Sequence, residues 1–290
     1  MLRLGLEIAD RLLRVLPHGI AYGLADVAGD AWYRFAPARR RLVTANLRRV
    51  CDATGRPTTG DAFRHLVRDA FRHHARYYLE LLRTPHYPAQ RVDEIVDVPE
   101  WTTFEALLRD RPGVLVSCHL GNFEPFGIFL GVHGFRPLAP IEEIEPQALY
   151  RFLADRRGGG HVDLVAVHRA RRALARRLAD GGLIGIIGDR DLTGDGLPVT
   201  LFGHPTSVPT GAAALAVMHG ASLIVGRCLR IGPDRFRAEG DVLELPASGD
   251  RRADVEALTR TIATTFERDI GAAPEQWWGA FQQFWPDLGS

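Results

Sequence analysis

The sequence predicts an α/β fold with a central, mostly parallel sheet flanked by helices and preceded by a helical N-terminal extension. Two observations lead to this prediction. From about residue 86 onward, short apolar runs typical of strands alternate with helical segments. Several of these runs, such as residues 183–187, are almost continuously apolar, as parallel strands buried on both faces are. No linker or repeat divides the chain, so we expect a single domain over 1–290, with a helical part at 1–85 and an α/β core at 86–290.

The composition excludes several classes of protein. With 46% hydrophobic and 24% charged residues, the chain is neither disordered nor fibrous. It contains no lysine, so all 36 basic side chains are arginine. This excludes P-loop sites, protein kinases and pyridoxal-phosphate enzymes, because each needs a lysine. The cysteines Cys51, Cys118 and Cys228 have the spacing of neither a disulfide scaffold nor a zinc site, and we expect no metal, no other cofactor and no nucleic-acid partner.

The N-terminal part begins with an amphipathic helix over residues 1–16. Its charged residues are too frequent for a spanning helix or a signal peptide. A second apolar segment, 20–35, carries Trp32, Tyr33 and Phe35 and precedes three arginines at 39–41. Aromatic rings beside arginines suit the headgroups of an anionic membrane, and we expect these helices to lie on its surface. The alternative is that both helices cover the core. The apolar stripe of the first helix consists of Leu2, Leu6, Ala9, Leu13 and Leu16.

The elements behind this extension follow from local periodicity. A helix is expected over 61–83, where Thr84-Pro85 ends it. The expected strands are 113–118, 162–167, 183–188 and 222–229, and the helical segments that follow them are 123–132, 169–179, 211–219 and 236–245. The longest stretch without arginine or acidic residues, 197–226, is divided by prolines and glycines, so we expect no membrane-spanning segment there.

The most informative string is residues 115–125, where a predicted strand turns into a predicted helix. The strand ends at His119, Gly121 permits a tight turn, and Asn122 is a favourable N-cap. Because ligands of open α/β sheets bind beyond the carboxyl ends of strands, we expect the active site here. Histidine is well suited to remove a hydroxyl proton near neutral pH, and the backbone amides near Gly121 and Asn122 are candidates to stabilise an oxyanion.

A histidine that acts as a base needs a carboxylate to fix its tautomer, and the sequence offers two. Glu124 falls in the first turn of the helix after His119. Asp189 follows another apolar strand, in the string Asp189-Arg190-Asp191, where charges are costly to bury unless they are used or paired. An ion-paired loop is the structural alternative for this string. The choice between the two carboxylates stays open.

These strings together resemble the bacterial lipid A biosynthesis acyltransferase family, which contains lauroyl and myristoyl transferases and the actinobacterial phosphatidylinositol mannoside acyltransferase. The resemblance extends over nearly the whole chain. Its segments are the His-x4-Asp/Glu motif from His119 to Glu124, the arginine-rich Asn-Leu helix at 39–47, Asp189-Arg190-Asp191-Leu192, Leu201-Phe202-Gly203, Pro209 and Gly211, Leu215-Ala216, and the closing segment Pro274-Glu275-Gln276-Trp277-Trp278.

The resemblance implies a glycerolipid acyltransferase-like fold. It implies transfer of an acyl group from a thioester donor, acyl-CoA or acyl carrier protein, to a hydroxyl of a glycolipid or phospholipid. The expected place is the cytoplasmic face of the inner membrane, with peripheral or monotopic attachment. His119 is then the general base. The nearest matches to the arginine that binds the acceptor in the wider superfamily are Arg156 and Arg157, and Arg190 and Asp191 are further candidates for substrate binding.

Two other functions stay open from the sequence. One is a non-catalytic lipid-binding protein of the membrane surface with the same fold, and the other is an acyl thioesterase, for which water is the acceptor. The C-terminal aromatics Trp277, Phe281 and Phe284 or Trp285 have helical spacing, and they either cover the core or contact the membrane. The mannoside branch of the family has aspartate in place of Glu124, so the resemblance does not name the acceptor.

Overall fold

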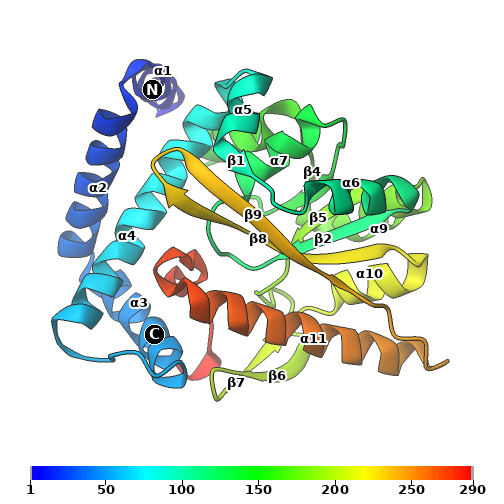
Figure 1. Ribbon diagram of the computed structural model, residues 1–290. Helices are drawn as coiled ribbons and strands as arrows, with labels where there is room; N and C mark the ends of the chain where they lie inside the picture. The colour runs from blue at the N-terminus through cyan, green and yellow to red at the C-terminus, as the bar shows by residue number, and fades with distance from the viewer. Residues whose placement is uncertain (1, 289–290) are drawn as a thin grey trace.

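The computed structural model describes residues 2–288, with the backbone alone for residues 2–6, 8 and 9. Its centre is a seven-stranded sheet with the order β1-β9-β8-β2-β5-β3-β4 (Figure 1). Only β8 and β9 pair antiparallel, so the mostly parallel sheet is confirmed. The strands are β1 (Val96–Asp97), β2 (Gly113–Ser117), β3 (Leu138–Ile141), β4 (Asp163–Ala166), β5 (Leu183–Ile187), β8 (Ser222–Gly232) and β9 (Arg235–Leu243).

Helices cover both faces of this sheet, as Figure 1 shows. The elements on one face are α9 (Val167–Ala179), α10 (Gly211–His219) and α11 (Arg251–Ala272), and those on the other are α6 (Trp101–Asp110) and α7 (Phe123–Val132). Alternate strand residues divide between these faces. Val114, Val116 and Ile184 belong to the large core with α9 to α11, whereas Leu115 and Gly185 face a cavity beneath α6 and α7.

The N-terminal extension is helical, as predicted. Its helices are α1 (Leu2–Val15), α2 (His18–Phe35), α3 (Pro37–Ala53) and α4 (Gly60–Arg83). Leu13 and Leu16 pack against a small cluster around Ala21 and Leu79, which supports the core-covering alternative for this end of α1. The predicted stripe residues Leu2, Leu6 and Ala9 lie outside the residues whose side chains are described.

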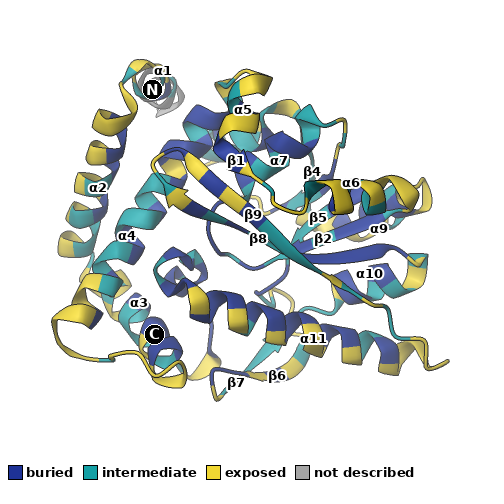
Figure 2. Ribbon diagram, in the orientation of Figure 1, coloured by how far each residue is buried: buried dark blue, intermediate teal, exposed yellow. Residues whose placement is uncertain are grey.

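Helix α2 carries two aspartates on its inner side and an uncharged apolar stripe on its outer side. Asp26 and Asp30 turn toward α4, where Asp26 pairs with Arg76 at 2.6 Å and Asp30 pairs with both Arg68 and Arg72. On the opposite side, the α2 ribbon carries the colour of exposed residues (Figure 2). The exposed hydrophobic residues of α2 are Ile20 (54%), Leu24 (51%), Val27 (66%) and Phe35 (80%). This uncharged stripe has no partner among the residues that the structure describes.

The aromatic residues of α2 separate into two groups. Trp32 packs on Phe71 and Phe281, with ring centroids about 5 Å apart, and Tyr33 also packs on Phe71. The prediction that these two rings face a membrane is therefore wrong, because they cover the core, whereas Phe35 is exposed. Within the described residues, no helix is both long enough and apolar enough to cross a membrane.

Several elements differ from the sequence prediction. Of residues 236–245, predicted as helical, 236–243 belong to strand β9, in which buried Phe236 and Ala238 alternate with exposed Arg235 and Arg237. That period of two is the pattern of a strand. The elements that the prediction omits are α5 (Ala89–Ile95), β1, α6, β3, α8 (Gln147–Arg156), the hairpin of β6 (Leu197–Leu201) and β7 (His204–Val208), and α11.

The closing segment after α11 is not an α-helix. It consists of short 3-10 turns, η3 (Pro274–Gln276), η4 (Trp278–Phe281) and η5 (Pro286–Leu288). Trp277 and Trp285 are fully buried in the large core, so the prediction that these aromatics cover the core is confirmed and the predicted helix is wrong. The first part of the segment, 274–281, is mostly buried (Figure 2), and it lies between α3, α4 and the end of β2.

Candidate active site

The centre of the site lies where β2 and β5 end side by side. These strands are parallel neighbours, with Ser117 opposite Ile187, so the residue two positions beyond each end comes to the same edge of the sheet. His119 and Asp189 occupy those positions. The Asp189 carboxylate accepts one hydrogen bond from the His119 backbone N–H at 3.0 Å and contacts Nδ1 of the His119 ring with its other oxygen. The sequence left two partners open for His119, and the structure pairs it with Asp189.

The His119–Asp189 pair is largely shielded from solvent. The Asp189 side chain is fully buried and the His119 side chain is 13% exposed. Burial by itself raises the pKa of the Asp189 carboxyl, but the adjacent His119 and the hydrogen bonds to it lower the pKa more, to below its usual range. The ionised carboxylate fixes the proton of the imidazole on Nδ1. Nε2 is then the ring nitrogen that can accept a proton.

The closing segment holds both members of the pair. The Trp278 ring meets the His119 ring edge-on, with centroids 4.3 Å apart, and the Gly279 N–H donates to the His119 carbonyl at 3.2 Å. A Cβ on Gly279 would lie 3.2 Å from the Asp189 carboxylate. On the other side of the segment, Asn46 of α3 donates to the carbonyls of Ala280 and Gln282 at 2.7 and 2.8 Å. Residues from both ends of the chain thus fix the orientation of His119.

The turn after His119 has the predicted geometry but not the predicted chemistry. Gly121 has φ +67°, and Asn122 caps α7 by accepting a hydrogen bond from the Glu124 N–H at 3.0 Å, both as expected. However, the Gly121 N–H donates to the Gln276 carbonyl at 3.0 Å and the Asn122 N–H to the Cys228 carbonyl at 2.7 Å. Because both protons are already bonded, the interpretation of these two amides as oxyanion donors is corrected.

Glu124 does not orient His119; it pairs with the partly buried Arg157 beside the cavity. Its carboxylate accepts hydrogen bonds from the Gly158 N–H at 3.1 Å and the Tyr77 hydroxyl at 3.2 Å, and Arg157 pairs with it at 3.5 Å. Burial raises the pKa of Glu124, and these three partners offset only part of that effect. The glycines at 158–160 all have positive φ, which bends the chain back so that Arg157 and Gly158 reach Glu124.

The other predicted binding residues have protein partners. Arg156 pairs with buried Asp10 of α1 at 2.8 Å and so joins α8 to α1. Asp191 accepts hydrogen bonds from three backbone N–H groups of its own loop and from the Ser207 hydroxyl, so it stabilises that loop. Arg190 is partly exposed at the edge of the site and lies 3.5 Å from Glu142. Of the predicted arginines, Arg157 alone lines the cavity.

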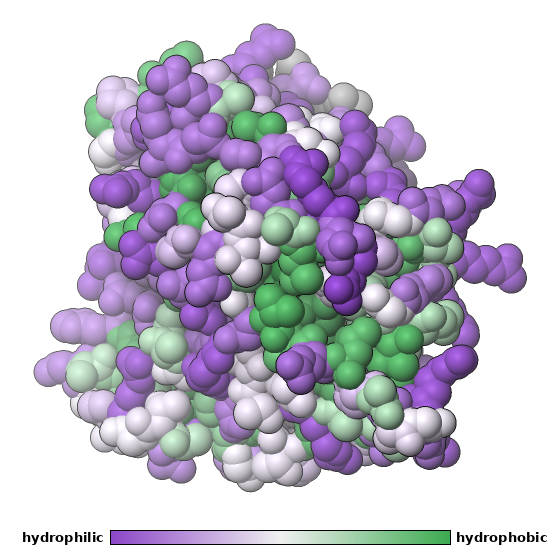
Figure 3. Space-filling view, turned by 45° about the vertical axis from the view of Figure 1, so that its right-hand side comes forward, coloured by the Kyte–Doolittle hydropathy of each residue, from purple (hydrophilic) through white to green (hydrophobic). Residues whose placement is uncertain are grey.

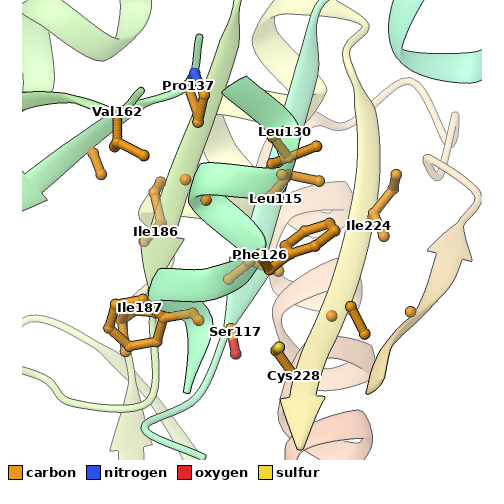
Figure 4. A pocket seen from close by; sticks show the side chains of 18 of the residues that line it. Leu115, Ser117, Phe126, Leu130, Pro137, Val162, Ile186, Ile187, Ile224 and Cys228 are labelled. Atoms are coloured by element: carbon orange, nitrogen blue, oxygen red, sulfur yellow. The ribbon is translucent and has the colours of Figure 1, made fainter. Parts of the chain in front are cut away.

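The cavity extends from the catalytic edge beneath α7 along the sheet (Figure 4). Its polar lining, including Glu124, Arg157 and Ser117, lies toward the end of the strands that carries His119. Figure 4 shows Phe126 and Leu130 of α7 over the strands that carry Leu115 and Ile224. The remaining lining is almost entirely aliphatic or aromatic, and it includes Phe104, Leu108, Val162, Leu164 and Ile187. Such a space accepts an apolar chain.

Two further observations concern the chemistry of the site. Among the described residues, no group of histidine, cysteine and carboxylate side chains has the arrangement of a metal site. Cys118 is buried next to His119 in sequence, and burial raises the pKa of its thiol well above the usual value. The His119 imidazole, oriented by the Asp189 carboxylate, is chemically suited to accept a proton at this edge of the sheet.

Comparison with known proteins agrees with this geometry. Residues 5–285 match the family described as bacterial lipid A biosynthesis acyltransferase. The phosphatidylinositol mannoside acyltransferase of Mycolicibacterium smegmatis is 30% identical over 98% of this chain and 92% of its own. The protein of the same name from Mycobacterium tuberculosis is 30% identical over 74% of this chain and 69% of its own.

The chain belongs to the bacterial lipid A biosynthesis acyltransferase family. It is an acyltransferase, as the sequence resemblance implies. Sequence reasoning located the His119 motif of this acyltransferase, but it missed three residues that build the site. They are Trp278, which packs on His119, Tyr77, which donates to Glu124, and Glu80, a buried carboxylate that accepts from the Asn122 side chain at 2.8 Å. Glu80 and Tyr77 lie within a strong helical pattern. A polar residue on the buried side of a helix is costly without a partner, and this was the signal in the sequence that could have indicated a role for these two residues.

Proposed function

We propose that this acyltransferase is an O-acyltransferase that moves a fatty acyl group from a thioester to a hydroxyl of a membrane glycolipid or phospholipid. The observation that carries the proposal is the His119–Asp189 pair, which lies two residues beyond Ser117 and Ile187, the last residues of β2 and β5 that line the apolar cavity. The pair supplies a base, and the cavity suits a fatty chain whose carbonyl carbon stops beside that base. The reaction needs no covalent intermediate on the protein.

The proposed reaction uses His119 twice. Nε2 takes the proton of the acceptor hydroxyl while its oxygen attacks the thioester carbonyl and forms the new C–O bond. The C–S bond then breaks, and the leaving thiolate takes the proton back from the imidazolium. Asp189 stabilises the positive charge that His119 carries between these steps. Acyl-CoA and acyl carrier protein both present such a thioester, so both are candidate donors.

Arg157 is the proposed contact to an anionic headgroup. It lines the cavity near its polar end, and its ion pair with buried Glu124 fixes its position. A guanidinium can hold a phosphate with two parallel hydrogen bonds. We expect Arg157→Gln to raise the KM for a phosphate-bearing acceptor by at least tenfold with a smaller effect on kcat. Exposed Arg151→Gln, on α8, is the control.

The names of the relatives support the proposed acceptor class. The curated relatives are named for phosphatidylinositol mannosides, which combine sugar hydroxyls with a lipid phosphate. A basic contact such as Arg157 and a base such as His119 suit both features. We therefore propose an acceptor of this kind, a mannose-bearing glycolipid, in the first instance.

Attachment to the membrane is proposed through the outer side of α2. Its apolar stripe of Ile20, Leu24, Val27 and Phe35 has no partner among the described residues, and exposed Arg34 and Arg41 flank its C-terminal end. Such a stripe suits the boundary between headgroups and acyl chains, with arginines toward anionic lipid. We propose a peripheral protein on the cytoplasmic face of the inner membrane, because thioester donors are made in the cytoplasm.

The central experiment measures acyl transfer. Purified wild-type protein and His119→Ala are incubated with a donor and with phosphatidylinositol mannosides in mixed micelles. The donor is either palmitoyl-CoA or palmitoyl-acyl carrier protein, labelled in the palmitoyl group. We expect labelled lipid with the wild type, a loss of at least 1000-fold with His119→Ala, and full activity with the control His65→Ala, which changes an exposed histidine of α4. Free fatty acid without labelled lipid would indicate a thioesterase. Lipid binding without either product would indicate a non-catalytic lipid-binding protein.

The membrane contact is tested separately with vesicles that contain phosphatidylglycerol. The double variant Leu24→Glu with Val27→Glu removes two apolar contacts and adds charge, so we expect binding to fall by about 100-fold. The matched control is the double variant Met218→Glu with Val242→Glu, which places the same two charges on exposed apolar residues of α10 and β9. Equal loss in both variants, or no loss in either, contradicts the assignment to α2.

A further inference from the structure

The sheet side of the cavity is built in rows, because every second residue of a parallel strand faces the same way. The first row beyond His119 contains Ser117 of β2 and Ile187 of β5. The second row crosses five strands. From β4 to β8 it contains Leu164, Ala139, Gly185, Leu115 and Ile224. Ala139 and Gly185 are neighbours because the residues before them, Leu138 and Ile184, lie opposite each other in parallel strands.

The second row has a gap at Gly185. A Cβ added to this glycine would meet no atom within 4 Å, and its neighbour on β3 is the small residue Ala139. Gly185 is not among the glycines with positive φ, so its backbone does not require glycine. What the missing side chain provides is open space, between the branched side chains of Leu115 on one side and Leu164 on the other.

The third row closes the passage. Its residues are Gly113 of β2 and Leu183 of β5, and α6 places Leu108 over them. A Cβ on Gly113 would lie 2.7 Å from both Leu108 Cδ2 and Leu183 Cδ1. These two leucines therefore meet above Gly113 and form a floor. Of Leu108, Gly113 and Leu183, Leu108 is the one that lines the cavity.

We propose that Gly185 and the Leu108–Leu183 floor determine the length of the acyl chain that this enzyme transfers. The inference rests on the proposed function and adds the residues that select the donor. Successive rows lie about 6.6 Å apart along a strand, and an extended hydrocarbon advances about 1.25 Å per methylene, so each row corresponds to about five methylenes. A chain held at His119 passes Gly185 at about the tenth carbon and reaches the floor at about the fifteenth.

Gly185→Leu tests the gap, because the new side chain enters open space and fills the second row. We expect the wild type to accept chains of about 14 to 16 carbons. In Gly185→Leu the optimum moves to about 10 carbons, with kcat/KM for the 16-carbon donor at least tenfold lower, since each excluded methylene weakens binding severalfold. Gly185→Ala fills less of the gap and gives a smaller shift in the same direction.

Leu183→Ala tests the floor, with a change of the opposite sign. Removal of its side chain deepens the cavity and moves the optimum toward longer chains by about two carbons. The matched control is Leu178→Ala, an equally buried leucine of α9 on the other face of the sheet, which lowers stability without moving the chain-length profile.

The outcomes separate this inference from the proposed function. The readout is the relative rate with saturated acyl-CoA donors of 8 to 18 carbons, competed in one mixture and resolved by mass spectrometry. An unchanged profile in folded, active Gly185→Leu and Leu183→Ala would overturn the inference and leave the acyl transfer intact. A wild type that transfers no chain of any length would overturn the proposed function itself.

Discussion

Replacement of Asp189 by asparagine is the sharpest test of the catalytic pair. Both oxygens of the carboxylate are occupied, one by the His119 backbone N–H and the other by the ring at Nδ1. An amide has one acceptor and one donor, so its NH2 group faces either the backbone N–H or the ring. If the NH2 group faces the backbone, it lies opposite the His119 N–H, which is also a donor, at about hydrogen-bond distance. If it faces the ring, it donates to Nδ1, and the imidazole proton moves to Nε2, the nitrogen that has to act as the base.

The expected loss follows from that tautomer. The corresponding change in the serine protease triad leaves the geometry intact and lowers kcat by about 10⁴, which is about 5 kcal/mol of transition-state stabilisation. We expect Asp189→Asn to lose about 10³ to 10⁴ in kcat with little change in KM for either substrate. The assay is acyl transfer to the glycolipid acceptor at saturating donor, with circular dichroism to show that the variant is folded. Asp180→Asn, which changes an exposed carboxylate beyond α9, is the matched control. Activity within tenfold of the wild type would refute the view that Asp189 sets the tautomer of His119.

Three further predictions concern stability. Burial lowers the pKa of His74 to about 3, so below pH 6.5 the unfolded chain binds a proton at this residue that the folded chain does not. The free energy of unfolding therefore falls as the pH falls, by about 2 kcal/mol from pH 6.5 to 5. In urea titrations, His74→Phe should remove that part of the pH dependence. In Gly121→Ala the new Cβ would overlap the Cys228 carbonyl at a positive φ, so we expect a loss of at least 2 kcal/mol in unfolding free energy, and a smaller change would show that the turn can relax. Asn46→Ala leaves two buried carbonyls without a donor and should cost about 2 to 4 kcal/mol together with activity, whereas Thr44→Ala on the same helix should cost less than 1 kcal/mol.

The residues that could be predicted from the sequence are those with local signals. The strand that ends near His119, the glycine turn and the Asn122 cap all lie within ten residues, and each has a known conformational preference. Helix α7 was therefore predicted with its observed bounds. Asp189 was one of two candidates, because a strand end indicates the edge of the sheet but not which strands are neighbours.

What the sequence could not show depends on contacts between distant segments. The burial of Trp278 against His119 needs the order of the strands and the path of the closing segment, and neither is encoded in a local pattern. The same holds for Arg156, whose partner Asp10 lies on the first helix. Helix α11 is a different case, because its signal is local. After the Asp250 cap, an apolar residue recurs every fourth position, at Leu258, Ile262, Phe266 and Ile270, and this period is typical of a helix.

The closing segment also determines when the site becomes complete during synthesis. By the time residue 189 has been made, the chain already contains His119 and Asp189, but Trp278 and Gly279 are made about ninety residues later. Asn46 stays without its two carbonyl partners until residues 280 and 282 have been made. A nascent chain that has not yet reached Trp278 therefore contains the catalytic pair but lacks the packing that orients its base. For the same reason, a truncation that removes the residues from 277 onward removes part of the active site.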